Sequence, residues 1–273
     1  MNPNAKTATP RSKRTSRTAP RPAARRPASS SLAKRRPSVA TATPTAFAGY
    51  ASNAMSFWFE LAAEMSREWF MENKARYQAE WEAPTKALLA HVQAALAPHY
   101  KPQKVAAPKV MRIHRDVRFS NDKAPYKTHI GAMLTVENPR GGTTGIGDGG
   151  CAALYFHLGA DEDFAAVGTY RFAPEQLTRW RKAIIGKPGA ALHALMTELR
   201  DQGYTVGGHD DYKRVPAGLD ANHPRAELLK LRGLTAIFPA IPKGLIHQPS
   251  LADWLVTHAT ATAPLVKWLT KNT

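Results

Sequence analysis

The sequence predicts an α+β domain with a central, mainly antiparallel sheet flanked by helices, and a disordered basic tail in front of it. Two observations lead to this prediction. Segments with helical periodicity come first and last in the folded part of the chain, and the strand-like segments lie together between them. The composition also changes near residue 46, where Pro-, Ala- and Ser-rich sequence gives way to periodic apolar sequence. We therefore expect a tail over 1–46 and a single domain over 47–273.

The tail carries most of the basic character of the chain. Residues 1–46 hold eleven Lys and Arg residues and no Asp or Glu, within a formal net charge of +17. So few large apolar residues cannot offset the chain entropy that is lost on folding. The tail has two interpretations: an arm that binds nucleic acid or another polyanion, or a solubilising or targeting leader.

Several classes of protein are disfavoured by composition. No stretch approaches the ~20 apolar residues of a membrane span, so we expect no membrane partner and a cytoplasmic location. The one cysteine, Cys151, excludes an internal disulfide framework and a cysteine-based zinc site.

Helix boundaries follow from capping residues and prolines. Ser66 is a suitable N-cap for a helix that begins at Arg67, and Pro84 and Pro174 stand where the first helical turn favours proline. Helices are expected over 67–81, 84–96, 174–185, 188–200, 224–231 and 251–269, the last of them interrupted near Pro264.

Strands are indicated by alternation and by β-favouring composition. They are expected over 109–117, 127–136, 151–158, 164–171 and 234–239. In the segment 127–136, every second residue from Thr128 to Val136 belongs to an apolar face, while Lys127 and His129 belong to the other face. The glycine-rich segment 137–150 leads into a strand and not into a helix, which favours a hairpin connection over a phosphate-binding loop.

The segment 115–129, RDVRFSNDKAPYKTH, is a charged turn. Asn121-Asp122 and Pro125 favour a turn over a helix, so these charges are not the solvated face of a helix. Arginine forks and lysine ammonium groups suit a phosphate or a carboxylate. The residues proposed to bind such an anion are Arg115, Arg118, Asp122, Lys123, Lys127, Tyr155 and His157. The alternative is an ion-pair network that only holds the turn together.

Two histidines are expected to meet on the polar face of the sheet. If 127–136 pairs with 151–158 around a centre near residue 143, His129 lies almost opposite His157, with Tyr155 on the same face. Such a site suits acid–base chemistry, with His129 or Asp116 moving the proton. No His-x-His or His-x-x-x-His spacing occurs there, so no metal ligand is assigned and the cofactor is left unknown.

The chain resembles the domain of unknown function 2461 family. The resemblance is carried by the Arg-Asp-x-Arg-Phe-Ser-x-Asp-Lys-x-Pro-Tyr-Lys-Thr-His pattern at 115–129, and further by Phe47-Ala-Gly-Tyr50, Tyr155-Phe-His157 and His223-Pro-Arg225. It covers most of 47–271 and none of the tail. The resemblance implies one folded unit, but it brings no catalytic residue with it.

Three functions follow as hypotheses. The first is the binding of a small anionic ligand at the charged turn and the histidine face, and whether the protein is an enzyme stays open. The second is association with nucleic acid through the tail, with base stacking available only from Tyr155 and Tyr170. The third is a non-catalytic structural or interaction domain.

Overall fold

A computed structural model describes residues 46–118, 120–137 and 152–273. Apart from Ala46, the predicted tail lies outside the described residues, as do Cys151 and most of the glycine-rich connection. The expectations for those segments are therefore not addressed by the structure.

The centre of the fold is a six-stranded antiparallel sheet in the described part of the chain, with strand order β1-β2-β3-β4-β6-β5. Helices lie before, after and between the strands in the sequence, which confirms the α+β prediction. The strands are β1 Lys109–Val110, β2 His129–Thr135, β3 Ala153–Gly159, β4 Asp163–Thr169, β5 Thr205–Gly207 and β6 Leu234–Ile237.

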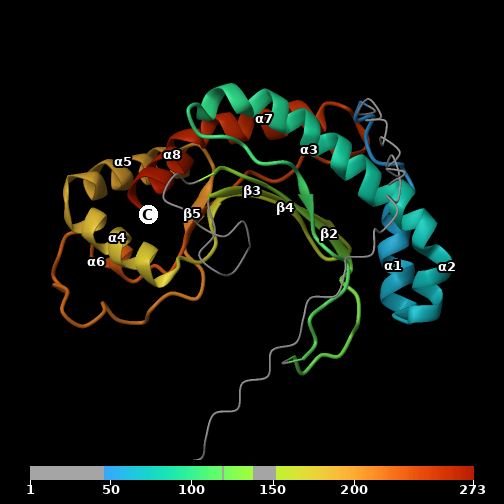
Figure 1. Ribbon diagram of the computed structural model, residues 1–273, viewed down its shortest axis with the longest axis horizontal. Coiled ribbons are helices and arrows are strands. Elements are labelled where there is room, and N and C mark those ends of the chain that lie inside the picture. The colour runs from blue at the N-terminus through green and yellow to red at the C-terminus, as the bar shows by residue number, and fades with distance from the viewer. Residues whose placement is uncertain (1–45, 119, 138–151) are drawn as a thin grey trace, which may run out of the picture. The chain divides into compact units, whose positions relative to one another are not determined.

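The sheet is curved, and helices α3, α7 and α8 run across its convex side (Figure 1). The concave side faces away from these helices. The α-helices are α1 Met55–Glu64, α2 Arg67–Tyr77, α3 Ala83–Leu96, α4 Pro174–Ile185, α5 Lys187–Asp201, α6 Ala226–Leu229, α7 Leu251–Ala261 and α8 Ala263–Asn272. A π-helical turn, η1 Gln78–Glu82, joins α2 to α3, and 3₁₀ turns lie at η2 Ala97–Tyr100 and η3 Leu245–His247.

Alternation along the strands assigns the two faces of the sheet. Ile130, Leu134 and Phe156 are buried in the hydrophobic core. Because successive side chains of a strand point to opposite faces, His129, Met133 and the other odd-numbered residues of β2 belong to the concave face. The sequence predicted this division correctly. Three of the largest core side chains are the fully buried Trp58, Trp81 and Trp180.

Three elements differ from the prediction. Helix α1 was not predicted, although its buried residues Phe57, Trp58 and Leu61 have helical spacing. Strand β5 is only three residues long and was also missed. The strand expected over 109–117 ends at Val110 and is followed only by an isolated bridge between His114 and Tyr126.

Strand pairing ends just beyond the His114–Tyr126 bridge for a local reason. The Arg115 N–H donates to the Pro125 carbonyl, but Pro125 has no N–H to donate in return. The Asp122 carboxylate instead accepts the Ala124 N–H at 2.9 Å, and the Asp116 carboxylate accepts the Arg118 N–H at 3.3 Å. Such local side-chain bonds favour turns over strands.

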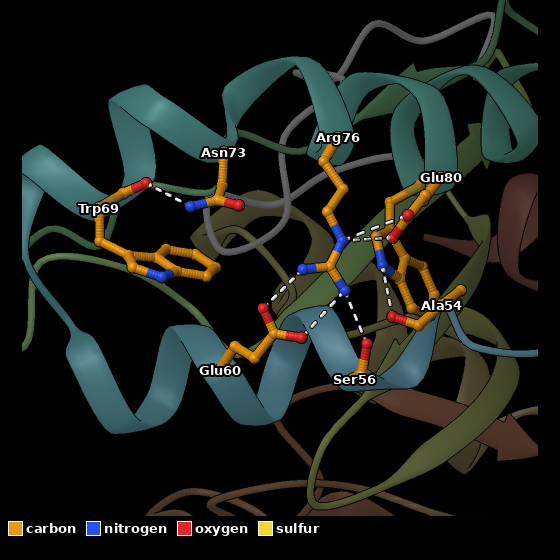
Figure 2. A network of polar contacts seen from close by, with 8 residues as sticks. Ala54, Ser56, Glu60, Trp69, Asn73, Arg76 and Glu80 are labelled. Atoms are coloured by element: carbon orange, nitrogen blue, oxygen red, sulfur yellow. Dashed lines mark hydrogen bonds and ion pairs between the residues drawn. The ribbon is translucent and has the colours of Figure 1, made fainter.

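Arg76 joins α1 to α2 in a network of polar contacts (Figure 2). Its Nη1 lies 2.6 Å from Glu60 Oε2, its Nε lies 3.1 Å from Glu80 Oε2, and its Nη2 donates to Ser56 Oγ at 2.6 Å. The guanidinium also lies 5.5 Å from the centroid of the Phe57 ring. One partly buried cation on α2 therefore satisfies acceptors from α1 and from the π-helical turn.

We predict that Arg76→Met lowers the free energy of unfolding by about 1–3 kcal/mol, because several charge-assisted hydrogen bonds are lost together. The control is Lys86→Met, which removes an exposed lysine paired four residues away with Glu82 at 2.5 Å. That change should cost less than about 0.5 kcal/mol. Urea unfolding measures the free energy of unfolding of both variants. Equal losses in the two would contradict a larger contribution from the Arg76 network.

Candidate functional site

A cavity of about 780 Å³ lies on the concave face of the sheet. It extends from the His129 end of β2, across β3 and β4, to Thr235 on β6 and His209 after β5. The residues that line it are Met111, Lys127, His129, Met133, Ala153, Tyr155, His157, Glu162, Asp163, Phe164, Ala166, Val167, Gly168, Thr169, Tyr170, Arg171, His209, Thr235 and Ile237. Its floor is mostly apolar, and its polar groups gather at the two ends.

The two predicted histidines are neighbours at one end of the cavity. The His129 and His157 rings have centroids 3.9 Å apart and are inclined by 31°. The predicted pairing register was wrong by two residues, because Gly159 lies opposite His129 and Gly131 lies opposite His157. A shift of two keeps every side chain on its face, so the histidines still meet, along a diagonal.

Glycines opposite these side chains provide the space that they occupy. A Cβ added at Gly159 would lie 2.5 Å from the Cβ of His129, and a Cβ added at Gly131 would lie 2.8 Å from the Tyr155 hydroxyl. Residues on one face of adjacent strands compete for the same volume. The two glycines therefore leave room for the side chains of His129 and Tyr155 to lie close to the sheet backbone.

Tyr155 and His157 form a hydrogen-bonded pair. The Tyr155 hydroxyl lies 3.2 Å from His157 Nδ1, and His157 Nε2 lies 3.9 Å from a Glu162 carboxylate oxygen. Burial raises the pKa of Tyr155, so its hydroxyl keeps the proton that it can donate. In the His157 tautomer that carries its hydrogen on Nε2, Nδ1 accepts a hydrogen bond from the Tyr155 hydroxyl. The Nε2–H then points toward the Glu162 carboxylate.

Both histidines are neutral at neutral pH. Burial, the neighbouring His157 and the charges of Lys127 and Arg115 lower the pKa of His129 to about 4. Burial also lowers the pKa of His157, although Glu162 opposes the shift. The pair therefore presents N–H donors and nitrogen acceptors to the cavity, and no positive charge.

Lys127 supplies the positive charge at this end. Its side chain is partly buried, and burial together with the charge of Arg112 lowers its pKa. Within residues 46–118, 120–137 and 152–273, the ammonium group of Lys127 has no hydrogen-bond or ion-pair acceptor. A partly buried ammonium group without an anionic partner is energetically unfavourable and attracts an anion.

The other three cations of the charged turn are paired within the turn and do not line the cavity. Arg115 pairs with Asp122. Arg118 makes two contacts with Asp116, at 2.7 and 2.9 Å. The Lys123 ammonium donates to the Val117 carbonyl at 3.0 Å. The structure thus brings Lys127, His129, Tyr155 and His157 together and places the remaining predicted site residues elsewhere on the 111–128 segment.

Asp116 occupies an exposed position in that segment. Its hydrogen bonds from Arg118 lower the pKa of its carboxyl group to about 2. It is therefore ionised at neutral pH, and its acceptor atoms are turned to Arg118 instead of to the histidines.

The opposite end of the cavity was mostly missed by the sequence prediction. Tyr170 stacks on His209 with ring centroids 4.8 Å apart and an angle of 28°. His209 Nε2 lies 2.9 Å from the Thr235 hydroxyl. Tyr170 was considered for stacking, but nothing in the sequence placed His209 beside it, because β5 was not recognised.

The described residues contain no group of three or more His, Cys, Asp or Glu side chains that could hold a metal ion. They also contain no helix long and apolar enough to cross a membrane.

The lowered pKa values of the histidines predict how stability depends on pH. Because the folded pKa of His129, about 4, lies below the value of 6.5 for an unperturbed histidine, the unfolded chain binds more protons between these values. The stabilisation is complete above pH 6.5 and is lost as the pH falls toward 4. We expect His129→Gln to flatten this decline, and the exposed control His193→Gln to keep it.

The measurement is the free energy of unfolding at several pH values between 4 and 7.5, taken as the difference between each variant and the wild type. Parallel curves for His129→Gln and the wild type would contradict the assignment of a depressed pKa to His129.

Comparisons with known proteins identify the family of the chain but not its activity. No curated protein and no solved structure matches the chain. The model of the family described as "Conserved hypothetical protein (DUF2461)" matches residues 53–268, which span the sheet, the cavity and nearly all of the helices. The chain therefore belongs to the DUF2461 family.

Proposed function

We propose that the protein binds a small phosphate- or carboxylate-bearing ligand in the concave-face cavity, with the Lys127 ammonium as its charge partner. The observation that carries this proposal is the position of Lys127. It lies partly buried in the lining of a cavity, next to neutral donors, and its ammonium group pairs with no carboxylate of the described residues. An anionic ligand would supply the missing partner.

The neighbouring side chains suit the same ligand. The neutral His129 ring can donate an N–H to the anion, and Lys127 supplies the positive charge. The Tyr155–His157 hydrogen bond holds one ring in a fixed orientation, so little side-chain entropy remains to be lost on binding. The exposed carboxylates of Glu162 and Asp163 also line the cavity, and they would repel a ligand whose negative charge lies away from Lys127.

The cavity is favoured over the exposed part of the charged turn. Arg115, Arg118 and Lys123 each have an acceptor within the turn, so a ligand there would compete with existing contacts. Exposed cations are also well solvated and interact weakly with a single anion. Lys127, by contrast, is partly buried and lines the cavity.

We predict that inorganic phosphate, pyrophosphate or succinate raises the Tm of the wild-type protein, because a ligand that binds only the folded state stabilises it by mass action. Lys127→Met should abolish this increase. The variant itself should be as stable as the wild type or more stable, since a partly buried charge without a partner is removed.

Lys123→Met is the matched control, because it removes a lysine from the same segment outside the cavity. It should leave the ligand-dependent shift intact. A shift that survives in Lys127→Met but disappears in Lys123→Met would move the binding site to the turn. No shift with any of the three anions would refute the proposal.

A further inference from the structure

Tyr170 exposes a large aromatic surface inside the cavity. Its relative exposure is 50%, although it lines the cavity and follows the end of β4 directly. His209 covers the ring from one side, and no other ring contact of Tyr170 occurs among the described residues. Exposed apolar area of this kind is unfavourable in water and is removed when a flat group stacks on it.

The residues around Tyr170 hold the stack in place. His209 is fixed by its contact with the Thr235 hydroxyl, which is itself buried on β6. The next residue, Asp210, adopts a positive φ of 49° and pairs with both Arg171 and Arg232, at 2.7 and 3.0 Å. Positive φ is uncommon for residues other than glycine and is kept where surrounding contacts impose it. Tyr170 and His209 therefore form a pre-organised platform.

The platform lies far from Lys127 within the same cavity. His157 pairs with Phe164 of β4, and Tyr170 lies six residues beyond Phe164 along the chain. At the usual rise of a strand, this separation corresponds to roughly 20 Å before the curvature of the sheet is considered. A ligand that contacts both ends must therefore be long, with its flat group well separated from its terminal charge.

The floor between the two ends suits such a ligand. It is formed by small side chains on the concave face, among them Ala153, Ala166 and Gly168, which leave the backbone open to close approach. Met133, Tyr155 and Ile237 lie in the same row as Ala166 and border this strip of small residues.

We propose that the ligand is a nucleoside polyphosphate, with its base stacked on Tyr170 and its terminal phosphate bound by Lys127. This inference rests on the proposed anion site and adds the chemical class of the ligand. Stacking between a base and an aromatic side chain accepts any base, because every base has a flat π-face. A single-ring acid is too short to reach both ends.

Isothermal titration calorimetry with inorganic triphosphate, ATP and UTP separates the two halves of the site. For the wild type we expect at least one nucleotide to bind about ten-fold more tightly than triphosphate, which is the contribution expected of one stacked base. Tyr170→Leu should abolish this difference and leave the affinity for triphosphate unchanged. Tyr170→Phe should preserve the difference, because the ring is kept.

Phe59→Leu is the matched control, since Phe59 on α1 is 58% exposed and lies outside the cavity lining. It should change no affinity. If triphosphate binds but neither nucleotide binds more tightly, or if the advantage persists in Tyr170→Leu, the stacking inference is wrong and the anion site stands. If none of the three compounds binds, the proposal that Lys127 binds a phosphate group is wrong as well.

Discussion

The alternation of side chains along β2, β3 and β4 determines which residues form the core and which line the cavity. One face of the sheet is covered by α3, α7 and α8 and holds Ile130, Leu134 and Phe156 in the core. The same backbone then presents every other residue to the concave side. A change of register by one residue would place His129 and His157 under the helices, so the fold and the candidate site are specified together.

The concave face, unlike the face covered by helices, leaves a cavity between its side chains. Glycine and alanine leave space beside the few large side chains, and the resulting cavity has an apolar floor with polar groups at each end. This distribution resembles ligand sites in general, which are mostly apolar and carry a small number of placed polar groups. Ligand orientation would then be set by Lys127 at one end and by Tyr170 at the other.

The sequence was most informative where residue periodicity is strong. It predicted the fold class, the two faces of the sheet and the contact between His129 and His157. It could not fix the exact register, because 138–151 is too long a connection to define one and a shift of two residues preserves all the faces. It missed β5, whose three residues are too few for a pattern, and with it the position of His209.

The charged turn shows a different limit of sequence reasoning. The density of cations at 115–129 indicated a binding site, but residue types alone do not reveal which charges are already paired. Arg115 and Arg118 each have an aspartate within a few residues, and local pairs of this kind form before any ligand arrives. Lys127, two residues before β2, instead lines the cavity, and this position depends on tertiary structure.

A crystal structure of the protein with bound pyrophosphate would show where the anion binds. We predict that it lies in the concave-face cavity, with a phosphate oxygen within hydrogen-bonding distance, about 3 Å, of Lys127 Nζ and with the pairs Arg115–Asp122 and Arg118–Asp116 intact. An anion bound by Arg115 or Arg118 at the exposed turn, with the cavity empty, would contradict it.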